Sequence, residues 1–286
     1  MRTNAPRVLL RLVVGAGVLG AACLLYSAYR ELWARAGWTW PFAVDDVTMP
    51  PLTKVVGALF DPVSGRDQRL IGLLWHASLF TAKEAAVGFA AGSVVGFLLG
   101  AVIAHFRVLK RGLMPYVVAS QTIPILAIAP MVVVGLGNVS IGGWTPDDWV
   151  RVSVIAAYLT FFPVTVNTVR GLESADPRAI ELMKTYAASD FAIFRKLRVP
   201  SAVPYLFGAF RVAATASVVG AIVGELPSSI QGGLGGAIIN FNQYYALAPA
   251  NLWATNLIAA ALGITFFLAV VLAEKLLVHR PPEQLA

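Results

Sequence analysis

The chain has 286 residues, of which 58% are hydrophobic and only 13% are charged, and its formal net charge is +7. Soluble domains have about 45–50% apolar and about 25% charged residues, so this chain lacks the polar surface of a water-soluble protein. It is therefore predicted to be an integral membrane protein in a lipid bilayer. The positive charge does not call for a nucleic-acid partner, because basic residues at the ends of membrane spans set their orientation.

Six stretches are apolar and long enough to cross a bilayer, which takes about 20 residues for about 30 Å of hydrocarbon. They are residues 8–29, 82–105, 113–137, 149–170, 201–224 and 252–277. The predicted fold class is all-α, with six transmembrane helices in a single domain over residues 1–286. Residues 82–277 are expected to form a five-span core.

The first predicted span, residues 8–29, contains the only cysteine, Cys23, so an intrachain disulfide is impossible. The sequence "LGAAC" is close to a lipoprotein signal, but such signals have Leu three places before the Cys, where this chain has Gly20. An uncleaved span is therefore favoured over a signal peptide.

The distribution of basic residues predicts the topology. The connections 107–111 and 170–198 are rich in Arg and Lys, whereas the loop 138–148 has two aspartates and no basic residue. The positive-inside rule therefore predicts that both termini and the two basic connections are cytoplasmic. The segment 30–77, which mixes acidic and basic residues, is expected on the periplasmic side.

The second predicted span carries a glycine at every fourth position, and these glycines share one helix face: Gly88, Gly92, Gly96 and Gly100. Without side chains on that face another helix can approach closely, so the stripe predicts helix packing. Lys83 and Glu84 stand at the start of this span and are expected to snorkel or pair near the interface.

The third predicted span contains "QTIPILAIAPMVVVGLG", in which Pro124 and Pro130 each remove a backbone donor. In hydrocarbon the freed carbonyls need neighbours or a water-lined cavity, and broken helices are frequent along transport pathways. Gln121 and Thr122, directly before the break, are therefore candidates for contact with solute. A purely structural kink is the alternative.

Residues 171–200 form a charged connection that is predicted to fold as two short helices. Asp176 and the proline after it indicate an N-cap and first helical residue, with a helix to about Tyr186. Ser189 is predicted to cap the second helix, which Pro200 is expected to stop.

The second of these helices is expected to expose Phe191 and Phe194, with Arg195 and Lys196 near its end. Apolar rings in water with no core to fill indicate a docking surface. An amphipathic helix lying on the lipid headgroups is the alternative.

This connection resembles a motif of the membrane subunits of bacterial binding-protein-dependent ABC importers: Glu-Ala-Ala, three residues, Gly, nine residues, Ile-x-Leu-Pro. The chain has Glu181, then Ala187 at the Gly position, then Leu-Arg-Val-Pro ending at Pro200. "IPILAIAPMVVVGLG", and "GAIVGE" with a following "GLG", resemble the nitrate, sulfonate, taurine and bicarbonate-type branch, which includes pyrimidine-precursor and riboflavin-type importers.

The resemblance implies a type I ABC importer permease fold and a homodimer of the permease in the bacterial inner membrane. It implies a periplasmic or lipid-anchored solute-binding protein and separate ATPase subunits that hold ATP and Mg. In such permeases the connection is a coupling helix that docks on the ATPase. The residues expected to couple are Glu181, Ala187, Ser189, Phe191, Phe194, Arg195, Lys196 and Pro200.

The end of the fifth predicted span is the second candidate for the substrate path. Glu225 precedes "LPSSIQGGLGG", whose glycines allow a loop to fold back into the membrane. Asn240 follows on that loop. The candidate residues of the path are expected to converge near the dimer axis, with Glu225 ordering an outer gate; they are Gln121, Thr122, Glu225 and Asn240. The alternative is that Glu225 only caps backbone donors of the loop.

The sequence says less about the solute. An anion path should show basic residues in the spans; Arg211 is the main candidate, and a structural arginine explains it equally well. Without a basic cluster, a neutral, polar or aromatic nutrient is favoured.

Motifs of catalysis are absent from the sequence. It has no G-x-x-x-x-G-K-[ST] loop, no H-E-x-x-H and no G-x-S-x-G, and its three histidines are far apart: His76, His105 and His279. No metal site, no bound cofactor and no enzymatic activity are therefore expected in this chain. A secondary transporter, the first rival, should carry internal repeats and a carboxylate deep in a span, and a membrane-embedded enzyme is the second rival.

Overall fold

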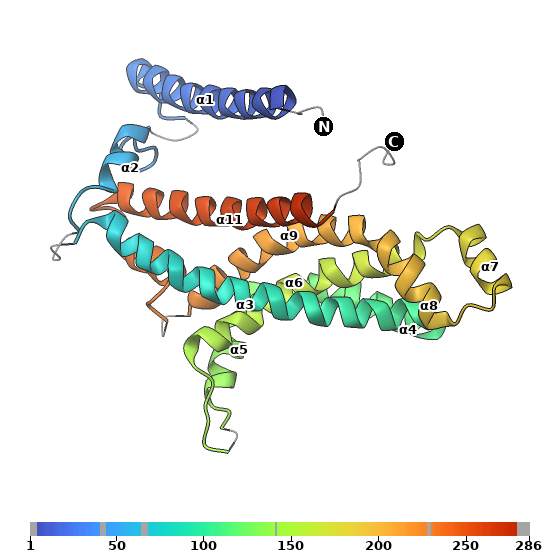
Figure 1. The fold of residues 1–286 in the computed structure, drawn as a ribbon. Coiled ribbons are helices and arrows are strands. Elements are labelled where there is room, and N and C mark those ends of the chain that lie inside the picture. Colours follow the sequence, from blue (N-terminus) through green and yellow to red (C-terminus); the bar gives the residue numbers. More distant parts are fainter. Residues whose placement is uncertain (1–4, 41–43, 64–67, 141, 228–229, 279–286) are drawn as a thin grey trace. The chain divides into compact units, whose positions relative to one another are not determined.

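The computed structural model describes residues 5–40, 44–63, 68–140, 142–227 and 230–278, and their regular structure is helical (Figure 1). The helices are α1 (Ala5–Ala36), α2 (Leu52–Ala58), α3 (Leu70–His105), α4 (Arg107–Ala119), α5 (Ile125–Gly137), α6 (Asp148–Glu173), α7 (Pro177–Thr185), α8 (Asp190–Ile193), α9 (Val199–Glu225), α10 (Leu234–Gln243) and α11 (Pro249–Leu277). A 3₁₀ turn, Ser120–Thr122, follows α4, and a π turn, Phe194–Arg198, follows α8.

The chain forms two compact units. Residues 1–73 and 240–256 make the first, and residues 74–239 and 257–286 make the second. The second unit holds most of α3 and all of α4 to α9, and with them Gln121, Thr122, Glu225 and the predicted coupling connection 171–200.

Four described helical runs are long and apolar enough to cross a membrane: α3, α6, the continuous run Asp190–Glu225, and α11. They contain four of the predicted spans. The bent pair α4–α5, with an angle of 96° between its parts, corresponds to the predicted span 113–137. The predicted span 8–29 lies within α1. The side chains of residues 5–13 are outside the described part of the chain, so this span stays a prediction.

The predicted span 82–105 lies within a longer helix, because α3 begins at Leu70. Its 36 residues extend over about 54 Å at about 1.5 Å per residue, more than the roughly 30 Å of hydrocarbon. Hydropathy therefore located the apolar part of a longer helix. Lys83 and Glu84 lie inside α3 and not at its start.

The break between α4 and α5 is a consequence of proline. Ile123 is extended, with φ −75° and ψ 123°, as expected for a residue before proline, and Pro124 then starts α5. Pro130 lies inside α5 without ending it.

The prediction that Pro200 stops the second short helix is wrong. The chain passes from α8 through the π turn directly into α9, with Pro200 in the first turn of α9. Proline cannot donate the usual i→i−4 bond. Directly before it, the Val199 N–H donates instead to the Phe194 carbonyl, five residues back, so that the wider π turn carries the helix past the proline.

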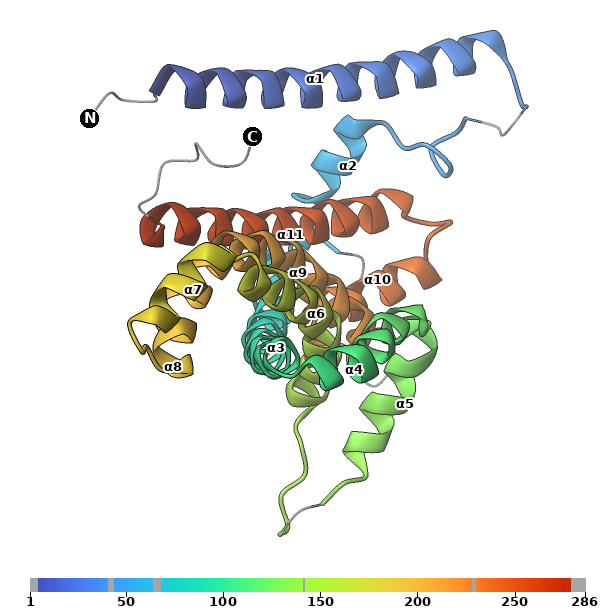
Figure 2. The same ribbon diagram turned by 90° about the vertical axis from the view of Figure 1, so that its right-hand side faces the viewer.

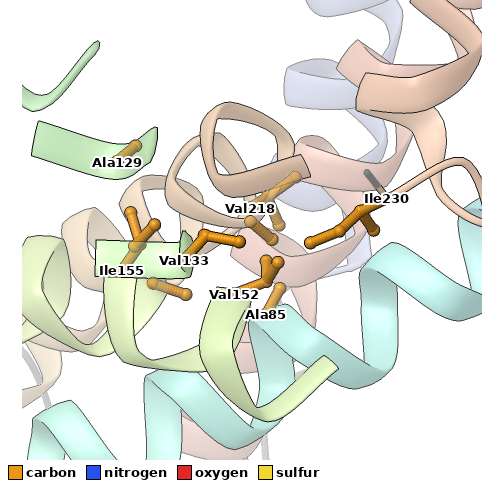
Figure 3. Close-up of a cluster of buried hydrophobic side chains, with 9 residues drawn as sticks. Ala85, Ala129, Val133, Val152, Ile155, Val218 and Ile230 are labelled. Carbon is orange, nitrogen blue, oxygen red and sulfur yellow. The ribbon is translucent and has the colours of Figure 1, made fainter. Parts of the chain in front are cut away.

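The core of the second unit lies where α3, α5, α6 and α9 meet, and α6 and α9 are in extensive contact. Figure 3 shows the side chains of Val133, Val152, Ile155 and Val218 gathered between these helices. In the same unit, α7 and α8 project from the end where α6 finishes and α9 starts, which Figures 1 and 2 show from two sides.

Candidate functional site

The coupling segment, defined here as residues 171–200, has both predicted caps. The Arg178 N–H donates to Asp176 Oδ1 at 2.9 Å, and the Ala192 N–H donates to Ser189 Oγ at 3.3 Å. Between the two helices Ala187 has a φ of +52°, a left-handed conformation that glycine adopts at lower cost than alanine. The turn at the motif's Gly position is thus formed here by an alanine.

The two phenylalanines of this segment have different surroundings. Phe191 is 70% exposed, whereas Phe194 is half-buried and packs against the cluster of Leu172, Ala202 and Leu206. The expectation that both rings are exposed is therefore wrong for Phe194. Its ring ties α8 to the ends of α6 and α9, a contact between distant residues that no local pattern could reveal.

Two further apolar side chains of the coupling segment are exposed, and the sequence analysis did not predict them. Leu182 is 58% exposed and Tyr186 is 81% exposed. They are four residues apart at the end of α7, and this i, i+4 spacing was the available signal. Of the remaining predicted coupling residues, the exposed ones are Glu181, Ala187, Ser189, Arg195 and Lys196, and Pro200 is half-buried.

The glycine stripe of α3 lies against α6. A Cβ added at Gly88, Gly92, Gly96 or Gly100 would lie between 2.4 and 2.6 Å from an atom of α6. At Gly92 the nearest atom is the backbone carbonyl oxygen of Ala157. Only glycine allows this separation of the two helices.

A buried polar corner joins α3, the end of α9 and the start of α10. The Thr81 hydroxyl donates to Glu225 Oε1 at 2.6 Å, and the Gly235 N–H donates to Glu225 Oε2 at 2.5 Å. The Leu234 N–H donates in turn to Thr81 Oγ1 at 2.9 Å. These are the contacts expected if Glu225 caps backbone donors. A Cβ at Gly233 would lie only 2.1 Å from the carboxylate, so this position also requires glycine.

Glu84 belongs to the same corner, which the sequence reasoning missed. Its side chain is fully buried, and its two carboxyl oxygens meet no donor among the described residues; the polar group beside them is the Glu225 carboxyl. Lys83 does not pair with it but lies 3.9 Å from the ring centroid of Trp149. The expectation of a snorkelling pair is therefore wrong.

The other predicted path residues are not joined to Glu225 by a hydrogen bond in the described part of the chain. Gln121 and Thr122 are exposed in the 3₁₀ turn, where the Thr122 hydroxyl donates to the Ala119 carbonyl at 2.7 Å. Asn240 is exposed and lies on α10, so the expectation that it follows on a loop is wrong. It belongs to the first compact unit.

The described residues contain no group of three or more His, Cys, Asp and Glu side chains that could hold a metal ion. The main basic candidate for an anion path, Arg211, forms an ion pair with Glu274 of α11 at 2.8 Å. This is the arrangement expected of a structural arginine.

The comparisons with known proteins agree on one family. Residues 92–280 match the family described as "Binding-protein-dependent transport system inner membrane component". The riboflavin transport system permease protein RibX of Chloroflexus aurantiacus is 33% identical over 226 residues, which cover 76% of this chain and 77% of the relative. The formylaminopyrimidine transport permease protein ThiX of Halalkalibacterium halodurans is 38% identical over 139 residues, covering 49% of this chain and 52% of that protein.

A solved structure shares the fold. An amino acid ABC transporter crystallised with histidines has a chain that matches with a TM-score of 0.57 at 15% identity, covering 72% of this chain and 95% of that one. Permeases of this family are transport subunits that work with a separate ATPase and a solute-binding protein, and they are not enzymes. The chain belongs to the binding-protein-dependent transport system inner membrane components, and it is the multi-pass permease subunit of an ABC importer for a small nutrient.

Proposed function

We propose that this permease carries a small neutral nutrient with a polar or aromatic ring, of the riboflavin or formylaminopyrimidine kind. The observation that carries the proposal is that three basic side chains on the described spans already have a partner within the chain. They are Arg211 with Glu274 at 2.8 Å, Arg151 with Asp148 at 2.7 Å, and Lys83 over Trp149 at 3.9 Å. An anion path would need basic groups free to meet the solute. The names of the two relatives agree with a heterocyclic substrate.

The proposed assembly is a homodimer of this chain in the bacterial inner membrane. Both termini face the cytoplasm, and residues 30–77 face the periplasm, where a soluble or lipid-anchored binding protein delivers the solute. Two ATPase subunits bind ATP and Mg on the cytoplasmic side. The asymmetry of basic residues between the connections supports this orientation.

The coupling segment is proposed to seat in a groove of the ATPase. Its exposed apolar side chains, Leu182, Tyr186 and Phe191, would be the buried anchors, and Arg195 and Lys196 would make contacts at the rim. Phe194 would pass the movement of the ATPase to α6 and α9 through the cluster it packs against.

The substrate path is proposed to run past the broken helix α4–α5. Gln121 and Thr122 at the break would contact the solute. Glu225 would hold the start of α10 in place as part of an outer gate, through its hydrogen bond from Gly235.

Uptake by cells tests the substrate class. The permease, its ATPase and its binding protein are expressed together in a strain that lacks its own riboflavin and pyrimidine uptake, and entry of labelled riboflavin and formylaminopyrimidine is measured. Uptake of one of these, unaffected by excess nitrate or alkanesulfonate, is the expected result. Uptake of either anion with no uptake of a heterocycle would contradict the proposal.

Cysteine labelling tests the orientation in a Cys23→Ser background. Ser64, the external position suggested by the topology, lies outside the described residues, so exposed Thr53 replaces it. Thr53→Cys should react with a membrane-impermeant maleimide from the periplasm, and Ser174→Cys should react only after lysis. Reaction of Ser174→Cys from the periplasm would contradict the proposed topology.

A further inference from the structure

A hollow beside α4 reaches Thr122 at one end, but its other end carries two arginines for which a neutral solute has no use. Its volume is about 880 Å³, and it is lined mainly by one face of α4, with Thr122 and Glu173 at its edges. The hollow lies within the second compact unit, at the end of the bundle where α3 gives way to α4.

One end of the hollow is basic. Arg107, Lys110 and Arg111 line it within the first turns of α4. Lys110 Nζ donates to both carboxylate oxygens of Glu173 at 2.7 Å, so its charge is compensated. Arg107 and Arg111 are exposed, and neither forms an ion pair in the described part of the chain. Four residues apart on a helix, they lie on one face and can meet the same anion.

The rest of the wall is apolar. Met114, Pro115 and Val118 follow the basic residues along α4 and line the same hollow. Val118 is 51% exposed. The hollow therefore changes from cationic to apolar along the helix axis, over about two turns of about 5.4 Å each. A small free anion would use only the basic end, whereas an amphiphile would use both.

We propose that this hollow is a binding site for an anionic phospholipid. The phosphate is held by the guanidinium groups of Arg107 and Arg111, which match phosphate oxygens with paired N–H donors. An acyl chain lies along Met114 and Val118. Basic pockets at the membrane surface of transmembrane helices are suited to anionic lipid headgroups, and the bilayer supplies such lipids at high local concentration.

Native mass spectrometry of the full-length, delipidated permease tests the site. The protein is titrated with phosphatidylglycerol and with phosphatidylcholine of the same acyl chains, and the first bound lipid is quantified. Phosphatidylglycerol should bind more tightly. Each basic residue beside an anionic headgroup contributes about a fivefold factor, so Arg107→Gln/Arg111→Gln should weaken phosphatidylglycerol binding roughly 25-fold. Phosphatidylcholine, whose choline cation offsets the charge of its phosphate, should be weakened much less.

Two further variants distinguish a specific lipid site from nonspecific attraction to positive charge and from a site for a free anion. Arg178→Gln/Lys184→Gln removes two exposed charges from α7 and should leave the affinity for phosphatidylglycerol within about twofold of wild type. Val118→Asn keeps both arginines but makes the apolar wall polar, so the affinity for phosphatidylglycerol should fall several-fold. All four substituted basic residues and Val118 are exposed, so the variants should fold as wild type does.

Three results would overturn the proposal. If the α7 variant lost as much bound phosphatidylglycerol as Arg107→Gln/Arg111→Gln, the attraction would be nonspecific. If glycerol phosphate displaced the lipid at a concentration equal to that of the lipid, the hollow would be a site for a free anion. A change in the monomer–dimer ratio of Arg107→Gln/Arg111→Gln, without loss of bound lipid, would assign this face to contact between two copies of the chain.

Discussion

The contact between α3 and α6 gives a prediction that can be worked out in numbers. In Gly92→Ala the new Cβ would lie 2.5 Å from the Ala157 carbonyl oxygen and 2.7 Å from Thr160 Cβ. Ordinary contacts of carbon atoms lie at about 3.5–4.0 Å, so the two helices must separate by about 1 Å. Because one of the opposing atoms is backbone, a change of rotamer cannot relieve the clash.

The size of the effect follows from two opposing contributions. Overpacking of this kind costs about 1–3 kcal/mol, and the better helix propensity of alanine offsets up to about 1 kcal/mol. Gly92→Ala should therefore lower the free energy of unfolding by about 1–2 kcal/mol. Gly263 of α11 provides a matched control, because a Cβ there would meet nothing within 4 Å. Gly263→Ala should be neutral or stabilising.

Denaturant or thermal unfolding of the purified permease in one detergent measures both variants, and uptake in cells shows whether transport follows stability. A Gly92→Ala variant as stable as Gly263→Ala would refute the reasoning, because it would mean that α3 and α6 are not held at this separation.

The remaining predictions concern the coupling segment and the buried corner. Phe191→Ala should leave the stability of the permease unchanged but weaken ATPase binding by about 2 kcal/mol, roughly 30-fold, as measured by co-purification or titration. Phe194→Ala should lower the unfolding temperature as well, since its ring packs inside the chain; equal behaviour of the two variants would contradict their assignment. Gly233→Ala should disrupt the corner and abolish uptake, because its Cβ would overlap the Glu225 carboxylate, and normal uptake would contradict the close approach. Arg211→Gln should reduce stability or yield without changing which solute enters, and a switch in substrate preference would place this residue in the path instead.

The features that could be predicted from the sequence depend on nearby residues. Asp176 and Ser189 cap helices because their own side chains reach backbone donors two or three residues ahead, and a short pattern contains all of that geometry. The break at Pro124 is local for the same reason.

The features that could not be predicted depend on contacts between distant residues or on an alternative backbone geometry. Glu84 looks like an interfacial residue in a hydropathy window, and its burial depends on distant segments that pack beside α3, the end of α9 with Glu225 among them. Phe194 is half-buried because the end of α6 and the start of α9 lie beside it. Pro200 fails to stop its helix because a π turn precedes it, and no propensity scale anticipates that turn.

The central claim is that ATP hydrolysis by a separate subunit drives transport through this chain by way of the coupling segment. The most direct test is to measure ATP hydrolysis and solute uptake together in proteoliposomes that contain the permease, its ATPase and its binding protein. Wild type should show uptake that requires ATP, whereas Phe191→Ala should retain insertion and lose uptake together with stimulation of the ATPase by the binding protein. Uptake that persists without the ATPase and collapses when the ion gradient is dissipated would contradict the account and indicate a secondary transporter.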